Sequence, residues 1–179
     1  MVTVVLAGCQ GGLHRRGDQQ IVVQADYGEP MRGNSYLGLT GGGSAANAGL
    51  TLGNHYFIED RVAVVGSVSY RYFDQSDGPV HAAELEMGLR FFFLEFGTVA
   101  FSFDIYIGGM VGTRSVPETG SHGNFLAGLG PTAEIQLGKK LSVLLGYQFR
   151  HLSNGGGFRD PDNPTQNDNR FYVGVALPW

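Results

Sequence analysis

Charged residues are scarce in this 179-residue chain, at 16% of the sequence, and the net charge at pH 7 is only −4. So small a share of charge is unusual for the surface of a water-soluble domain. A weakly acidic chain also offers no basic patch for nucleic acid. The composition therefore favours a surface that is not wholly exposed to water, and it argues against a nucleic-acid partner.

Long hydrophobic runs are also missing from the sequence. A membrane-spanning helix needs about eighteen consecutive apolar residues, and no stretch of the chain supplies them. Glycine is abundant at 29 residues, and aromatic residues reach 12%, which is typical of all-β proteins. A membrane-spanning β-barrel stays compatible with this composition, because barrel strands alternate apolar and polar residues.

Cysteine is nearly absent, since Cys9 is the only one, and no disulfide can form within the chain. It ends the segment Leu6-Ala7-Gly8-Cys9, which resembles a bacterial lipobox whose cysteine is lipidated after signal cleavage. The alternative is a spectator thiol in a frayed N-terminal segment. We expect residues 1–31 to be a signal or lipobox remnant and a tether, in which Ile21-Val22-Val23 could pair locally, and residues 32–179 to form the barrel domain.

The rest of the chain divides into eight alternating runs separated by turn signals, which predict eight strands. Tight turns alternate with longer polar loops, and the last run ends on the aromatic Trp179. Both features are typical of outer-membrane barrels. The predicted strands cover residues 32–41, 47–58, 61–73, 81–94, 99–112, 124–137, 141–153 and 169–179.

Within these runs, the row opposite the apolar one carries charges of both signs. We interpret this row as a satisfied network inside a closed lumen, since side chains fill the interior of an eight-stranded barrel and leave no open pore. The predicted fold is thus an all-β, eight-stranded antiparallel outer-membrane β-barrel. The polar row comprises Arg71, Glu84, Glu86, Arg90, Asp104, Glu134, Gln136, Gln148 and Arg150.

The alternative architecture is a soluble barrel or sandwich with the apolar row inside. That row carries bulky residues such as Phe91, Phe93, Phe101 and Phe103, more than a narrow barrel interior could hold. The membrane barrel is therefore the favoured interpretation.

Two polar residues end the strand predicted over residues 141–153. His151 and Ser153 are two apart, so on a strand they project from the same face. They continue the apolar row of Leu145, Tyr147 and Phe149. An imidazole beside a hydroxyl provides the first two parts of an activated nucleophile. The competing interpretation is a pair of ordinary polar residues at the interfacial end of a strand.

A third group must hold the imidazole if the pair is catalytic. Asn169 opens the next strand in its apolar row, and its amide oxygen could accept the imidazole N–H of His151. Asp168 is the alternative third member, although it points to the other face of a regular strand. Loop alternatives are Asp160 and Asp162.

The residues directly after Ser153 are suited to stabilise an oxyanion. They are Asn154, Gly155 and Gly156, and glycines let a backbone turn closely around a substrate. Three other histidines, His55, His81 and His122, are expected at the membrane interface or in loops. They lack the spacing of metal ligands, so neither a metal nor a cofactor is predicted.

The C-terminal segment resembles a known family. The residues concerned are Tyr147-Gln148-Phe149-Arg150-His151-Leu152-Ser153-Asn154-Gly155-Gly156, then Asn163-Pro164 and a last strand containing Pro178. They are similar to the lipid A 3-O-deacylases, the PagL-type or acyloxyacyl hydrolases. The likeness is sharp here and architectural elsewhere. It implies an eight-stranded barrel in the outer membrane of a Gram-negative-type bacterium. It further implies hydrolysis of the ester-linked acyl chain at the 3-position of lipid A.

The resemblance also implies residue roles. Ser153 would be the nucleophile, His151 the general base and acid, and Asn154 part of the oxyanion site. The family's best-known enzymes carry a glutamate as third member, and Asn169 takes that place when the last strands are matched without a gap. A neutral amide orients an imidazole but stabilises its charged form less than a carboxylate does.

Three hypotheses follow for the function. The leading one is a carboxylic ester hydrolase with a Ser/His site, whose partners are lipopolysaccharide and outer-membrane lipids. The second is a non-catalytic outer-membrane barrel with a structural or binding role. The third is a soluble β-barrel that binds a small apolar ligand.

Overall fold

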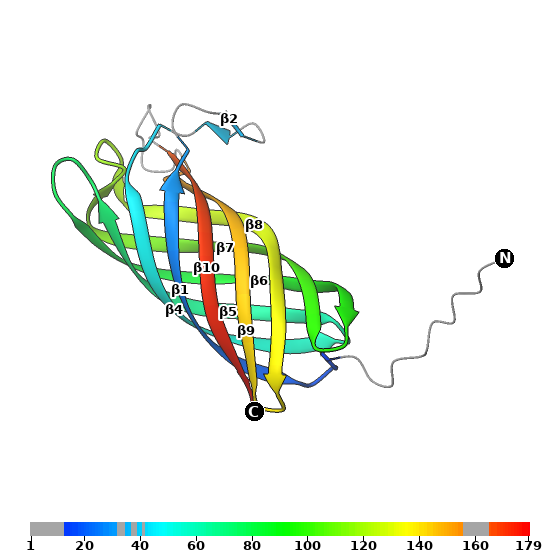
Figure 1. The fold of residues 1–179 in the computed structure, drawn as a ribbon. Helices are drawn as coiled ribbons and strands as arrows, with labels where there is room; N and C mark the ends of the chain where they lie inside the picture. The colour runs from blue at the N-terminus through cyan, green and yellow to red at the C-terminus, as the bar shows by residue number, and fades with distance from the viewer. Residues whose placement is uncertain (1–12, 32–34, 37–38, 41, 156–164) are drawn as a thin grey trace.

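Eight long strands close into a single antiparallel barrel in the order β1-β10-β9-β8-β7-β6-β5-β4, as the computed structural model shows (Figure 1). The structure describes residues 13–31, 35–36, 39–40, 42–155 and 165–179. The predicted fold class is confirmed. The barrel strands are β1 (Gln19–Pro30), β4 (Ala46–Glu59), β5 (Val62–Asp74), β6 (Val80–Phe96), β7 (Val99–Val116), β8 (Ser121–Gly138), β9 (Leu141–Ser153) and β10 (Gln166–Pro178).

No helix in the described part of the chain has the length and apolar character needed to cross a membrane.

The first strand of the barrel lies earlier in the sequence than predicted. β1 falls inside residues 1–31, which were expected to be a tether, and it closes the barrel by pairing with both β4 and β10. The predicted strand at residues 32–41 contributes instead the short β2 (Ser35–Tyr36) and β3 (Leu39–Thr40), which form a separate sheet. β1 fits the barrel because its buried and more exposed residues alternate as in the other barrel strands.

The two ends of the barrel differ in their connections. At one end, here called the turn end, tight turns at Asp60-Arg61, Gly97-Thr98 and Lys139-Lys140 join consecutive strands. Trp179 also lies at this end, where its backbone N–H donates to Gln19 at 3.2 Å. Longer connections gather at the opposite, loop end (Figure 1). In outer-membrane barrels the tight turns lie in the periplasm and the longer loops lie outside the cell.

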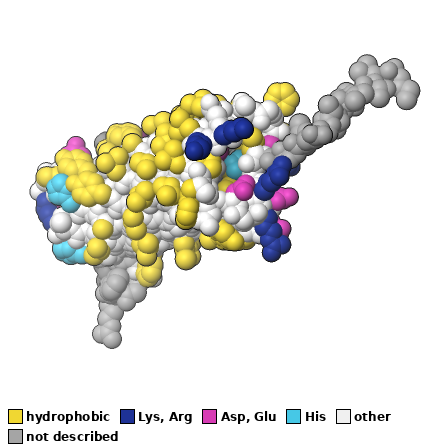
Figure 2. All heavy atoms as spheres, turned by 90° about the horizontal axis from the view of Figure 1, so that it is seen from below, with side chains coloured by type: hydrophobic (Ala, Val, Ile, Leu, Met, Phe, Trp, Pro, Cys, Tyr) yellow, Lys and Arg dark blue, Asp and Glu magenta, His cyan; other side chains and the backbone are white. Residues whose placement is uncertain are grey.

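The outer wall of the barrel is apolar. Large side chains such as Leu50, Met87 and Phe93 expose 61%, 61% and 64% of their surface. Figure 2 shows apolar side chains spread along this wall, with most of the visible charged side chains toward its ends. A wall of this kind is stable when hydrocarbon covers it.

The lumen holds the polar row, as predicted. Arg71, Arg150 and Arg170 are fully buried. Arg71 contacts Asp26 at 2.5 Å and Glu84 at 2.9 Å. Asp26 and Arg170 were missed, because β1 was not expected in the barrel and residue 170 was not assigned to the polar row.

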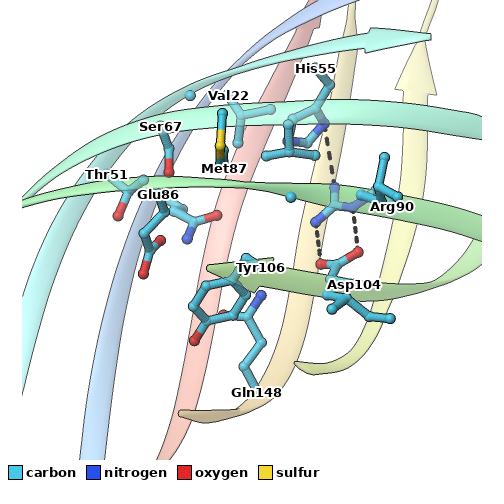
Figure 3. Close-up of a pocket in the computed structure, with 16 residues that line it drawn as sticks. Val22, Thr51, His55, Ser67, Glu86, Met87, Arg90, Asp104, Tyr106 and Gln148 are labelled. Carbon is cyan, nitrogen blue, oxygen red and sulfur yellow. Dashed lines mark hydrogen bonds and ion pairs between the residues drawn. The ribbon is translucent and has the colours of Figure 1, made fainter. Parts of the chain in front are cut away.

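His55 also lies inside the lumen, so its predicted place at an interface or in a loop is wrong. Its imidazole is buried and lies 3.5 Å from Arg90, which pairs with Asp104 at 2.6 Å (Figure 3). The inward row of β4 carries His55 there, because residues on one face of a strand recur every second position.

Clusters of buried apolar residues lie toward both ends of the polar lumen. The loop-end cluster includes Phe73, Val80 and Leu152, all buried. At the turn end, Phe57 and Phe92 pack together with Leu13 beside them. His14 stacks on Phe92 there, with ring centroids 3.8 Å apart. The absence of an open pore stays a prediction.

Candidate active site

The candidate residues lie where β9 and β10 meet at the loop end. Residues paired across neighbouring strands are here called a rung. His151 shares a rung with Asn167 on β10 and with Ala127 on β8. Ser153 ends β9 and shares a rung with Phe125, two rungs from that of His151. His151 and Ser153 are both half-buried and project from the outward face, as predicted.

Asn167 is the residue that contacts the imidazole. Its side-chain oxygen lies 2.7 Å from Nδ1 of His151, which is a good hydrogen-bond distance. When the amide oxygen accepts this bond, Nδ1 is the donor, and in the neutral imidazole Nε2 can then accept a proton. An unprotonated Nε2 is the state that a general base requires. Asn167 itself is fully buried.

Asn169 does not take the place that the sequence suggested. It shares its rung with Phe149, and its side-chain oxygen accepts the hydroxyl of Tyr147 at 2.7 Å. The cross-strand register is the reason, because the partner of His151 is two residues earlier on the same outward row. Asn167 was missed because β10 begins at Gln166, three residues before the predicted start. The period-2 row extended backward from Asn169 is the signal that would have found it.

Asp168, the alternative third member, points into the lumen. It is fully buried, and its carboxylate accepts hydrogen bonds from Gln166 at 2.8 Å and Asn47 at 3.0 Å. This agrees with the expected face of the strand and separates Asp168 from the imidazole. Four other predicted residues, Cys9, Gly156, Asp160 and Asp162, lie outside the described residues. Lipidation of Cys9 stays a prediction.

The chain turns sharply after Ser153. Asn154 is fully buried, and Gly155 adopts a positive φ of 68°. A Cβ at position 155 would come within 3.2 Å of the Phe125 ring. Glycine therefore suits both the left-handed backbone and the close contact. The turn begins directly after Ser153.

A hollow in the outer wall adjoins these residues. It has a volume of about 710 Å³ and is lined by side chains that include Met87, Ile107 and Ala127. Gly66 contributes to its floor, and a Cβ there would meet nothing within 4 Å. From β8 to β5, the rung of His151 consists of Ala127, Ile107, Met87 and Gly66.

A second hollow, of about 520 Å³, shares Leu85, Gly109 and Phe125 with the first. Phe125 and Gly109 continue the rung of Ser153. The two hollows form an apolar groove, here called the wall groove, that leads from the site across β8, β7 and β6.

The described residues contain no group of three or more His, Cys, Asp or Glu side chains that could hold a metal ion. Imidazole and hydroxyl groups such as those of His151 and Ser153 are suited to proton transfer and nucleophilic attack.

Solved structures place this architecture among the small outer-membrane β-barrels. The crystal structure of the outer membrane enzyme PagL matches with a TM-score of 0.62 and 18% identity, over 86% of this chain and 97% of that one. Neisserial surface protein A matches with a TM-score of 0.65 and 10% identity, over 89% and 96%. OprG from Pseudomonas aeruginosa matches with a TM-score of 0.58 and 12% identity, over 93% and 97%. At such identities the likeness establishes the fold.

The family follows from the sequence. The family model "Lipid A 3-O-deacylase (PagL)" matches residues 51–176, which is most of the chain. The chain therefore belongs to the lipid A 3-O-deacylase family of outer-membrane hydrolases. No curated protein matches the chain in sequence.

Proposed function

We propose that Ser153, His151 and Asn167 are the catalytic group of an outer-membrane esterase that removes the 3-O-acyl chain from lipid A. The observation that carries this proposal is the 2.7 Å contact between His151 Nδ1 and Asn167. It lies on the outward face at the loop end of the barrel, where the headgroups of the outer leaflet begin. Membership of the lipid A 3-O-deacylase family supports the choice of substrate.

The acylation step uses His151 as the base. Nε2 of His151 takes the proton from Oγ of Ser153, and Oγ attacks the carbonyl carbon of the 3-O-acyl ester. Asn167 holds the Nδ1 proton, so the imidazole stays in the tautomer that can accept a proton at Nε2. A tetrahedral intermediate with a negatively charged oxygen results.

Donors at the turn after Ser153 stabilise that oxygen. Asn154 and the backbone N–H of Gly155 are the candidates among the described residues. The intermediate then collapses: the bond from the acyl carbon to the sugar oxygen breaks, and that oxygen takes the proton from His151. Water, deprotonated by His151, next attacks the acyl–Ser153 ester, and the bond from the acyl carbon to Oγ breaks as Oγ takes that proton back from His151. The products are a free fatty acid and lipid A with a hydroxyl at the 3-position.

The amide at position 167 sets the expected rate. A carboxylate would both orient the imidazole and stabilise its protonated form, whereas an amide does only the first. The proposed enzyme therefore turns over more slowly than a version with a carboxylate partner. A carboxylate at this fully buried position would carry an unpaired charge whenever the imidazole is neutral, and the neutral amide of Asn167 does not.

The wall groove supplies a place for the leaving acyl chain. Its floor runs along the rung of His151 from Ala127 on β8 to Gly66 on β5, a span of about 14 Å at the usual strand spacing. A fatty acyl chain in this groove stays in contact with apolar side chains and lipid while its ester reaches Ser153. The lining of the groove is apolar, including Leu85, Met87 and Ile107, as an acyl chain requires.

The direct test is to incubate the purified barrel with lipopolysaccharide in detergent micelles and to measure lipid A by mass spectrometry. We expect the wild type to remove one ester-linked hydroxyacyl or acyl chain and Ser153→Ala to remove none. Ser121→Ala is the matched control, because Ser121 is a partly buried serine near the same loop end, on β8, and donates to a backbone oxygen.

Two results would contradict the proposal. Lipid A of unchanged mass with the wild type, where a PagL enzyme removes a chain, would argue for a non-catalytic barrel. Chain release by Ser153→Ala equal to that of the wild type would exclude Ser153 as the nucleophile.

A further inference from the structure

The start of β10 is held from inside the barrel by the two chain neighbours of Asn167. Gln166 and Asp168 point into the lumen, and both are fully buried. We propose that these two side chains are positioning residues, which fix the amide of Asn167 against His151. This inference rests on the proposed function, in which Asn167 orients the catalytic imidazole.

Gln166 ties the start of β10 to the segment before β4. The pairing of β1 with β10 runs to Pro30 and Asp168, and the Met31 N–H then donates to the Asn167 carbonyl at 2.7 Å. The side chain of Gln166 adds a contact with Ala45: its oxygen accepts the Ala45 N–H at 3.2 Å, and its nitrogen donates to the Ala45 carbonyl at 2.8 Å. This two-point contact imitates a rung of the sheet. It attaches the backbone next to Asn167 to the residue that precedes β4.

The segment before β4 is shaped to allow this contact. A Cβ at Gly43 would lie 2.5 Å from the side-chain oxygen of Gln166. The backbone N–H of Gly43 also donates to Thr165 at 2.8 Å, as does that of Gly42. Glycine at position 43 therefore lets the two segments approach closely.

Asp168 fixes the other side of Asn167. Its carboxylate accepts hydrogen bonds from Gln166 at 2.8 Å and from Asn47 at 3.0 Å, and it lies 3.8 Å from Nη1 of Arg150. Arg150 is the chain neighbour of His151 and shares a rung with Asp168. The lumen thus links the two strands one rung away from the contact between His151 and Asn167.

The physical consequence is control of one hydrogen bond. Hydrogen bonds weaken steeply with distance and angle, and successive strand residues are about 3.3 Å apart. If the backbone on either side of Asn167 shifts, its amide oxygen moves relative to Nδ1 of His151. A fully buried polar network can hold such geometry, because each of its members is costly to displace.

The test compares Gln166→Met and Asp168→Asn with the control Asp104→Asn. Both test variants nearly preserve side-chain volume. Asp104 is also a buried lumen carboxylate, paired with Arg90 at 2.6 Å (Figure 3), but its rung is three residues from that of His151 along β7. Folding is checked for each purified variant by its heat-dependent mobility on a gel. Release of the acyl chain then gives kcat and KM, and spectra of protein labelled with ¹⁵N-histidine report the tautomer of His151.

We expect both test variants to fold, to keep KM, and to lose between about 10- and 100-fold in kcat. The Nδ1–H signature of His151 should weaken in both, while Asp104→Asn keeps the wild-type spectrum and kcat. A wild-type spectrum with wild-type kcat in both test variants would overturn the proposal. Equal losses in Asp104→Asn would overturn it as well, since they would reveal general stabilisation.

The remaining outcomes are also decisive. If both test variants fail to fold while Asp104→Asn folds, the two residues hold the barrel and not the imidazole, and the proposal is wrong. If the wild type releases no acyl chain, the proposed function fails. The tautomer of His151 in the variants still decides whether Gln166 and Asp168 position Asn167.

Discussion

The two halves of β10 differ in the burial and polarity of their residues. In the turn-end half, Phe171–Pro178, buried and exposed residues alternate up to Ala176, after which Leu177 and Pro178 are both exposed. In the loop-end half, Gln166–Arg170, four of five residues are buried and Asn169 is half-buried, whichever face they occupy. The turn-end half is a membrane wall with a filled lumen behind it. The loop-end half carries polar side chains on both faces, and the proposed catalytic contact lies within it.

The two halves of β10 differ in whether their outward residues are apolar, as a lipid-facing strand requires. Outward residues in the turn-end half, such as Val173 and Leu177, expose 52% and 42% of their surface, as lipid contact requires. In the loop-end half the outward positions are Asn167 and Asn169, which are costly next to hydrocarbon unless they are hydrogen-bonded. Places where a sequence breaks the local rule of its fold are expected to be functional.

The largest predicted effect comes from removing the base at the loop end. His151→Ala should lower kcat by about 10⁴-fold or more, because the nucleophile and its base act as a unit. His122→Ala is the matched control, since His122 is a histidine near the same end on β8 and contacts a backbone oxygen. Acyl-chain release measured for both variants checks this, and a His151→Ala enzyme within tenfold of wild type would sink it.

The second effect concerns stability in the turn-end half. Val173→Arg places a charge on the lipid-facing wall and should cost about 2–4 kcal/mol in unfolding free energy near the bilayer centre. Urea titration of the barrel in lipid vesicles measures this, with Val173→Leu as the neutral control. The folded fraction should keep its kcat. Loss of kcat at unchanged stability would mean that the two halves of β10 are not separable.

The third effect concerns the wall groove. Ala127→Phe fills the hollow on the rung of His151 and should raise KM by about tenfold, as steric changes in apolar pockets do. Val175→Phe adds similar bulk to the turn-end wall of β10, where it should leave KM unchanged. Kinetics with lipopolysaccharide dispersed in detergent compare the two, and equal KM values would exclude the groove as the acyl site.

The smallest effect is a gain in activity. Asn167→Asp restores a carboxylate opposite His151 and should raise kcat severalfold by stabilising the imidazolium that forms in the reaction. Asn169→Asp, on the neighbouring outward position, should bring no gain, because Asn169 bonds to Tyr147. A gain at position 169 alone would place the third member where the sequence matching put it.

The alternating rows in residues 47–58, 61–73 and 99–112 predicted their strands because large apolar residues recurred mainly at every second position. The same rows indicated the polar lumen and the outward face of His151 and Ser153. What failed was the start of β10, since Gln166-Asn167-Asp168 reads as loop in composition. Those residues form a strand because lumen contacts to Ala45, Asn47 and Arg150 satisfy them, and such contacts across distant strands are not visible along the sequence.

The place of β1 was also missed for a physical reason. Its inward residues include Gln20 and Asp26, which look like tether residues until their partners are known. Asp26 is matched by Arg71 on β5 and Arg170 on β10. The closure of a barrel thus depends on charge pairing between residues far apart in the sequence.

The most direct measurement of the central claim is the kcat of Asn167→Ala beside that of Asn169→Ala. The two asparagines are two residues apart on one outward row, and only Asn167 contacts His151. The account predicts a loss of about 10²-fold in Asn167→Ala, because a base without its orienting partner is poorly placed. It predicts a kcat close to that of the wild type in Asn169→Ala. The reverse order of the two losses would contradict it.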